Sequence, residues 1–313
     1  MSGEERSTQT ISELRGTGDL LGMPGGSRVQ SLEKFEVRLA PQCVECAMER
    51  PRRAGSRSDE DAERFVSDYE QDGFVIVKSF FAKSVMERVD QEAQQLWADP
   101  EGRISPSNLR CRYTDHHETG ERLFECFDPV IDVGPELARI ATDECLLELL
   151  SWLYRQPAVL FKDKLIFKPA GARGYPLHQD YIAWRGFPRS FLTVLVPLDA
   201  ATEENGCTVV YAGGHRQGLL TPADGQFHIV PRECVSEARR VPLALEPGDI
   251  AIFAGLTPHE SEPNRTALSR RQLYLSYNAH SDGGEQRLAH YRQFHRWLRE
   301  KYPRPDEEAW YFA

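Results

Sequence analysis

The sequence predicts a mainly β protein, a barrel or jelly roll of about eight core strands flanked by helices. Three observations support this prediction. Short β-type runs separated by turn residues fill the chain from Val159 onward, helical patterns occupy much of residues 58–154, and an amphipathic stretch runs from Glu285 to Tyr302. Strands that follow one another at short intervals, with turn signals between them, are typical of all-β sandwiches and barrels.

The N-terminal part of the chain precedes the predicted barrel. Residues 1–57 are rich in Gly, Ser, Arg and Glu and show no sustained period, which predicts a flexible or loosely docked extension. A run resembling a capping box begins a helix at Ser58, and residues 73–81 (GFVIVKSFF) are typical of a strand. A second helix follows and is closed by Pro100.

The segment between this second helix and the barrel is less regular. Residues 101–130 are polar and predict irregular structure. Residues 137–154 predict one or two further helices. We therefore expect one domain over residues 58–313, a single barrel in which helices from both ends of the segment buttress one sheet.

The barrel strands are separated by runs rich in turn residues, such as PAGARG and EPGD. We expect strands at 160–167, 175–184, 191–199, 207–213, 228–230, 241–245, 250–255 and 271–279. The last predicted element is a helix that packs back on the barrel through apolar residues at helical spacing, namely Leu288, Tyr291, Phe294 and Leu298.

The bulk composition limits the classes of function. Of the 313 residues, 40% are hydrophobic and 27% are charged, which is ordinary for a soluble globular protein. The formal net charge of −10 argues against nucleic acid or an anionic membrane as a partner. No apolar run approaches the ~18 residues of a membrane helix, and we expect no secretory signal, because residues 1–16 carry acids as well as bases and no apolar stretch. We expect a cytoplasmic protein, a monomer or weak homo-oligomer, with its seven scattered cysteines reduced.

His178-Gln179-Asp180 is the first candidate for a metal site. In a strand, residues two apart lie on the same face, so His178 and Asp180 could both point at one ion. Frequency does not decide the matter, because about one or two His-x-Asp/Glu matches are expected by chance and three occur. The other two, at 116–118 and 280–282, lie in polar or Gly-rich surroundings that favour loop contacts.

A third candidate ligand, His259, lies just past a predicted strand. Eleven residues later, Arg270 opens a strand whose alternate residues are all polar on one face: Arg270, Gln272, Tyr274 and Ser276. In a closed barrel covered by helices, such a face indicates a wet lumen. Two imidazoles and one carboxylate suit Fe(II) with open coordination positions, although they could also hold Zn(II). A guanidinium in the same lumen suits a small dicarboxylate and favours iron with an oxo-acid co-substrate.

The chain resembles the phytanoyl-CoA dioxygenase family of Fe(II)/2-oxoglutarate oxygenases, which includes ectoine hydroxylase. The resemblance runs from about Asp68 to the C-terminus and is carried by an ordered set of motifs. They are HQD (178–180), ENG (204–206), AGGH (212–215), PGD (247–249) and His259-x-Ser261-x-x-Asn264-x-Thr266-x-x-x-Arg270.

The resemblance implies a double-stranded β-helix core and a set of site residues. His178, Asp180 and His259 would bind iron, Arg270 would hold the distal carboxylate of 2-oxoglutarate, and Ser261 would assist it. The implied reaction couples decarboxylation of 2-oxoglutarate to oxidation of a C–H bond by O2. Halogenating relatives lack the carboxylate ligand, and because Asp180 is present here, the resemblance implies hydroxylation or another oxygen-rebound outcome.

Further pocket candidates are weaker. Lys162 and Lys164 share a strand face that could be lumen or solvent, and the resemblance puts Lys164 near the co-substrate or substrate. An inward lysine there would favour an anionic group. Thr193 is a candidate for the co-substrate pocket, although threonine is also a common strand former. Tyr181 and Trp184 could stack on substrate or pack in the core, and the resemblance matches Trp184 to a tryptophan near the substrate in ectoine hydroxylase-like members.

Two alternative functions remain open on the sequence. One is a double-stranded β-helix that keeps the metal site as structure or as a sensor of 2-oxoglutarate without turnover. The other is a zinc-dependent, cupin-like isomerase or hydrolase, in which Arg270 would have no dicarboxylate to bind. The substrate is a small molecule whose identity the sequence does not define, and a role in secondary metabolism is an expectation only.

Overall fold

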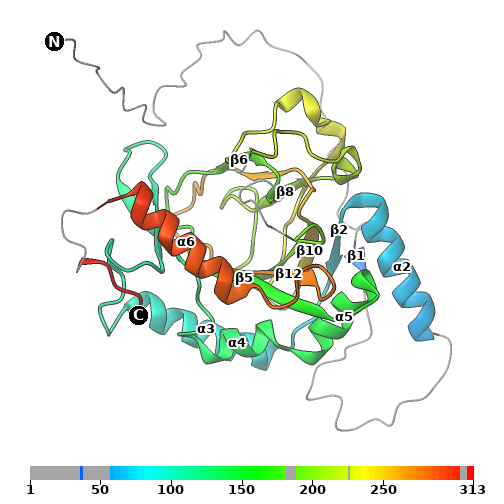
Figure 1. Ribbon diagram of the computed structural model, residues 1–313, viewed down its shortest axis with the longest axis horizontal. Helices are drawn as coiled ribbons and strands as arrows, with labels where there is room; N and C mark the ends of the chain where they lie inside the picture. The colour runs from blue at the N-terminus through cyan, green and yellow to red at the C-terminus, as the bar shows by residue number, and fades with distance from the viewer. Residues whose placement is uncertain (1–35, 38–56, 181–187, 225, 304–308) are drawn as a thin grey trace.

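The computed structural model describes residues 36–37, 57–180, 188–224, 226–303 and 309–313, and it contains two β-sheets that face each other (Figure 1). The larger sheet has eight strands, in the spatial order β1 (Glu36–Val37), β2 (Phe74–Val77), β10 (Ile250–Ala254), β7 (Leu192–Pro197), β12 (Gln272–Ala279), β5 (Ala158–Ile166), β4 (Arg122–Phe127) and β3 (Cys111–Asp115). The smaller sheet has four, in the order β6 (Tyr175–His178), β11 (His259–Ser261), β8 (Thr208–Tyr211) and β9 (Arg240–Pro242). The predicted jelly-roll fold is confirmed.

Alternation along β12 separates the core from the lumen. Leu273, Leu275 and Tyr277 are fully buried in the hydrophobic core on the outer, helix-covered face of the large sheet. Tyr274 and Ser276 point the other way and line a cavity between the sheets. Because successive side chains of a strand point to opposite faces, one strand serves both the core and the cavity.

Helices cover the outer face of the large sheet, as Figure 1 shows for α3, α4 and α5. The helices before the barrel are α2 (Arg57–Asp72), α3 (Lys83–Ala98), α4 (Pro135–Ala141) and α5 (Glu144–Tyr154). Buried residues of α3, such as Val89, and of α5, such as Leu150, share one hydrophobic cluster with Val194 of β7. A second apolar cluster joins Phe74 and Ala251 of the large sheet to Val210 of the small one.

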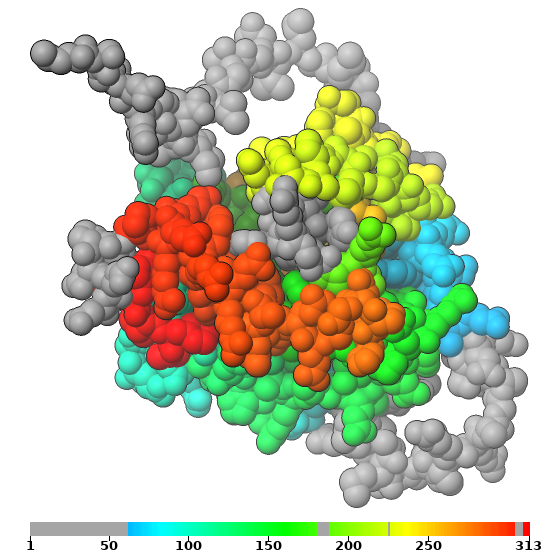
Figure 2. Space-filling model, in the orientation of Figure 1, coloured from blue at the N-terminus to red at the C-terminus, as the bar shows by residue number. Residues whose placement is uncertain are grey.

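The C-terminal helix α6 (Arg287–Lys301), coloured orange-red, lies on the face of the molecule toward the viewer in Figure 2. It is tied to β5 through Asp163, which is fully buried and accepts hydrogen bonds from the backbone N–H groups of Val130 and Ile131. Arg287 Nε lies 2.6 Å from Asp163 Oδ2. Leu288, predicted on the packing face, is 68% exposed, and His290 is buried instead.

Other predictions about the fold need correction. The irregular structure expected for residues 101–130 is wrong in part, because β3 and β4 extend the large sheet there. The expected strand at 228–230 is not formed, whereas His259, expected just past a strand, opens β11. The predicted extension at 1–57 lies outside the described residues, apart from the two residues of β1, which pair with β2, and Arg57, which begins α2. No described helix combines the length and the apolar character needed to cross a membrane.

We predict that Arg287→Met lowers the free energy of unfolding by about 3 kcal/mol, because it leaves the buried Asp163 carboxylate without its charged partner. Arg265→Met is the matched control. Arg265 and Glu262 are 55% and 50% exposed, and exposed pairs contribute about 1 kcal/mol or less. Urea denaturation measures both variants, and equal losses would contradict the structural role given to Asp163.

Candidate metal centre

The pairing of β6 with β11 brings two histidines together. In the antiparallel register, His259 is the direct partner of His178. The centroids of the two imidazole rings are 4.2 Å apart. Directly opposite residues of an antiparallel pair place their side chains on the same face of the sheet, so both rings point into the space between the sheets.

Backbone carbonyls fix the orientation of both rings. His178 Nδ1 lies 2.7 Å from the Pro176 carbonyl oxygen, and His259 Nδ1 lies 2.9 Å from that of Thr257. A carbonyl oxygen can only accept, so each Nδ1 carries the hydrogen and each Nε2 keeps a free lone pair. This tautomer is the one that a metal-binding histidine requires when its Nε2 is the ligand.

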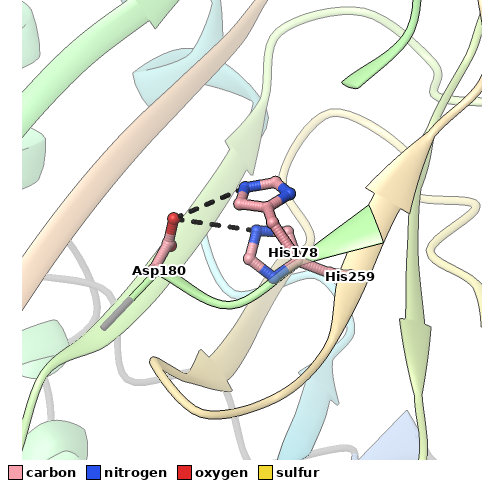
Figure 3. A group of neighbouring side chains, drawn as sticks. All are labelled: His178, Asp180 and His259. Atoms are coloured by element: carbon pink, nitrogen blue, oxygen red, sulfur yellow. Dashed lines mark ion pairs between the residues drawn. The ribbon is translucent and has the colours of Figure 1, made fainter. Parts of the chain in front are cut away.

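Asp180 completes a group of three ligand atoms (Figure 3). Its Oδ1 lies 3.7 Å from His178 Nε2 and 3.8 Å from His259 Nε2. Asp180 lies two residues beyond His178, where β6 ends, rather than on the strand as predicted. The three ligand atoms lie within 4.8 Å of one another, and the described residues hold no second such group. Two imidazoles and one carboxylate on one side of an ion form the facial triad suited to Fe(II).

Thr193 of β7 supports the carboxylate. Its hydroxyl donates to Asp180 Oδ2 at 3.3 Å and lies 3.1 Å from the Ser276 hydroxyl of β12. Because Thr193 contacts Oδ2 and both imidazole nitrogens lie near Oδ1, this contact leaves Oδ1 available to a metal. Thr193, predicted in the co-substrate pocket, therefore contacts a candidate metal ligand directly. Hydrogen-bonded groups behind a ligand commonly tune metal affinity.

Charge in the site favours the protonation states that bind metal. Burial, reinforced by the neighbouring His259, lowers the pKa of His178 to about 4, so its imidazole is neutral at physiological pH. Burial alone would raise the pKa of Asp180, but the adjacent imidazoles and Lys164 outweigh burial and lower it. At neutral pH, His178 is thus a neutral imidazole and Asp180 a carboxylate, and these are the forms that bind a metal.

A cavity between the two sheets surrounds the triad. Its lining comes from both sheets and from the loops next to them: Lys162, Lys164, Ile166, Tyr175, His178, Asp180, Phe191, Thr193, Thr208, Phe253, His259, Glu260, Ser261, Tyr274 and Ser276. Lys162 and Lys164 thus face the lumen, a question the sequence left open. Lys162 lies 3.3 Å from Asp128, whereas Lys164 Nζ lies 4.9 Å above the Tyr274 ring.

Arg270 lies behind the cavity wall. It is 2% exposed, and its Nη2 donates to the Gly206 carbonyl at 3.2 Å. Its Nε and Nη1 have no hydrogen-bond partner among the described residues. Buried guanidinium N–H groups without acceptors are unusual in folded proteins, and a carboxylate accepting both would satisfy them. Arg271, on the opposite face, instead pairs with Asp199 and Asp90.

Sequence reasoning missed Lys168, which adjoins Ser261 and Arg270. Its Nζ donates to Ser261 Oγ at 2.9 Å. The available signal was the two-residue spacing that Lys168 shares with Lys162, Lys164 and Ile166, although Lys168 lies beyond the end of β5 and is not among the residues that line the cavity. Of the predicted substrate residues, Tyr181 and Trp184 lie outside the described residues.

Comparison with known proteins assigns the family. The family model described as Phytanoyl-CoA dioxygenase (PhyH) matches residues 69–272. The chain belongs to the phytanoyl-CoA dioxygenase family. A 2-aminoethylphosphonate dioxygenase from the uncultured bacterium HF130_AEPn_1 is 31% identical over 242 residues, which cover 77% of this chain and 88% of that protein.

Two further similarities agree with this assignment. A methylphosphonate hydroxylase from Gimesia maris is 39% identical over 132 residues, covering 42% of this chain and 49% of that protein. The crystal structure of EctD from S. alaskensis with 2-oxoglutarate and 5-hydroxyectoine has a TM-score of 0.59 at 22% identity, and the match covers 79% of this chain and 84% of that one. This structural likeness supports the double-stranded β-helix fold.

Family membership makes this chain an oxidoreductase of the dioxygenase class, with Fe(II), 2-oxoglutarate and O2 as cofactor and co-substrates. The donor set of His178, Asp180 and His259 fits the iron. The unpartnered N–H groups of Arg270 fit a carboxylate. The zinc isomerase or hydrolase and the non-catalytic sensor that the sequence left open are therefore not favoured.

We predict that Thr193→Val weakens Fe(II) binding roughly 10- to 100-fold, the range typical for loss of a group that holds a metal ligand. Asp180→Ala, which removes a ligand, should bind Fe(II) still more weakly. Thr208→Val is the matched control, because Thr208 lines the same cavity but contacts Tyr274 rather than a ligand. Anaerobic equilibrium dialysis gives the affinities, and equal effects at Thr193 and Thr208 would refute the supporting role of Thr193.

Proposed function

We propose that this chain hydroxylates a C–H bond of a small molecule, with 2-oxoglutarate decarboxylated to succinate and CO2. The observation that carries the proposal is the triad itself. Three ligand atoms within 4.8 Å of one another face a cavity, and both imidazoles are held in the ligating tautomer. Bound iron with 2-oxoglutarate and O2 supplies the oxidising chemistry.

The residues of the chain hold, orient and shield the reactants. His178, Asp180 and His259 would occupy one side of the ion and leave the cavity side open to the keto acid and O2. Arg270 would hold the far carboxylate of 2-oxoglutarate and so fix the direction of the keto acid. The rings of Phe191 and Phe253 line the cavity and limit the access of water to the reacting C–H bond.

We further propose that the substrate carries an anionic phosphonate group. Lys164 lines the cavity, and no carboxylate lies within ion-pair distance of its Nζ among the described residues. Burial opposes its charge, but Asp180 and Asp128 raise its pKa, so the amine is an ammonium. Two relatives are named for phosphonate substrates, which supports this class.

We predict a visible metal-to-ligand charge-transfer band when Fe(II) and 2-oxoglutarate are added anaerobically to the wild type. Asp180→Ala should give no band, and Arg270→Met should need far more 2-oxoglutarate to reach it. The control is Arg271→Met, because Arg271 points away from the lumen to Asp90 and Asp199. Absence of a wild-type band with iron demonstrably bound would refute the function.

We also predict that Lys164→Met raises the KM for a phosphonate substrate roughly 10- to 100-fold, since a charge-assisted contact is lost. Succinate release measures turnover with 2-aminoethylphosphonate, methylphosphonate and larger phosphonates. A neutral phosphonate diester is the matched ligand, and its turnover should not depend on Lys164. If wild type discriminates poorly between acid and diester, the phosphonate class is wrong.

A further inference from the structure

The amine of Lys168 is buried among three hydrogen-bond acceptors of the protein. The side chain is 1% exposed, and its Nζ donates to Gly206 O at 2.9 Å, Ser261 Oγ at 2.9 Å and Glu262 O at 2.6 Å. Three acceptors match the three N–H donors of an ammonium group. Because the amine is buried and all three of its donors have acceptors, its position is fixed by the protein and it does not extend into solvent.

Gly206 leaves the room that this amine needs. Its φ of +71° is in the left-handed region, and a Cβ there would meet both Lys168 Nζ and the Glu262 carbonyl. The Gly206 carbonyl also accepts from Arg270 Nη2 at 3.2 Å, so two cationic side chains share one acceptor. Burial and the adjacent Arg270 lower the pKa of Lys168 to about 7, against an opposing effect of Glu125. A carboxylate bound beside the two cations would favour the charged form of the amine.

The hydrogen bonds of Ser261 determine where its hydroxyl hydrogen points. A hydroxyl oxygen accepts two hydrogen bonds and donates one. Ser261 Oγ accepts one from Lys168 Nζ at 2.9 Å and one from the Tyr175 backbone N–H at 3.2 Å. Both acceptor positions are filled, and the described residues offer no acceptor for its hydrogen. Because Ser261 lines the cavity, its hydroxyl is left as a donor to whatever occupies that cavity.

We propose that Lys168 is a positioning residue for the co-substrate. It fills an acceptor position of the Ser261 hydroxyl, so that this hydroxyl must donate to the distal carboxylate of 2-oxoglutarate. Arg270 Nε and Nη1, which have no partner among the described residues, supply the other donors to that carboxylate. This inference rests on the proposed function, because it concerns the keto acid that the iron site uses.

The test compares two keto acids on the Fe(II)-loaded protein without O2. 2-Oxoglutarate and 2-oxopentanoate share the keto acid that would bind iron, but only the first has a distal carboxylate. Their affinities are measured by calorimetry and by the charge-transfer band. The proteins are wild type, Lys168→Met, Lys168→Arg, Ser261→Ala and the double variant with Lys168→Met and Ser261→Ala, each checked for folding by thermal unfolding.

We expect Lys168→Met to weaken 2-oxoglutarate binding roughly 10- to 100-fold, as expected for hydrogen bonds to a charged group. Binding of 2-oxopentanoate should not change, and Lys168→Arg should retain part of the lost affinity. Because Lys168 acts through Ser261, the double variant should bind no more weakly than the weaker single variant.

Three results would overturn the proposal. Additive losses in the double variant would mean that Lys168 acts independently of Ser261. Equal losses for both keto acids would mean that Lys168 only maintains the local structure, and unchanged affinity would deny it any role. In each of these cases a wild-type band with 2-oxopentanoate still supports the iron site, so the proposed function survives. If Lys168→Met does not fold, Lys168→Gln takes its place, because glutamine keeps a polar terminus. The ratio of its affinities for 2-oxoglutarate and 2-oxopentanoate is then compared with that of the wild type.

Discussion

The candidate site depends on the register between β6 and β11. His259 opposes His178 in this pairing, and a slip of one residue would turn one imidazole away from the lumen. The register is supported from the other side, where His259 opposes Val210 of β8, a residue of the apolar cluster that joins the two sheets. Packing between the sheets therefore holds the two nitrogen ligands in place before any metal binds.

Burial of charged side chains in and behind the lumen costs free energy, and their ion-pair and hydrogen-bond partners offset part of this cost. Lysine, arginine and aspartate are rarely buried unless they are paired. Lys162 lies against Asp128, and Lys168 has three oxygen partners. Arg270 keeps two N–H groups without partners among the described residues. A carboxylate that accepts hydrogen bonds from these N–H groups would bind favourably, because a buried donor without an acceptor costs free energy.

The sequence predicted what depends on alternation and on motif order. The two-residue period of β12 separated its core face from its lumen face, and the spacing from His178 to Arg270 singled out residues that the fold brings to one cavity and the wall behind it. It did not predict β3 and β4, because their polar residues become strands only by pairing with each other and with the distant β5.

Other features could not be predicted because they depend on side-chain reach. Arg110 lies in the segment for which the sequence predicted irregular structure. It is buried and donates to the carbonyl of Ala313, 203 residues away. Lys168 likewise gains its role from Ser261, 93 residues along the chain. Periodicity predicts the face of the strand from which a side chain projects. It does not predict which atom the end of a long side chain contacts.

The division of the cavity between two sheets would separate metal binding from the substrate recognition that we propose for Lys164. Two of the three candidate metal ligands come from β6 and β11 of the small sheet, whereas Lys162 and Lys164 come from β5 of the large one. The distance between the two histidines and the charged substrate group that we propose would then depend on the packing of the two sheets. β5 pairs with β12 and β4, whereas the two histidines are held by the pairing of β6 with β11. Such an arrangement allows one metal site to act on substrates of different charge, which is consistent with function being determined by the site rather than by the fold.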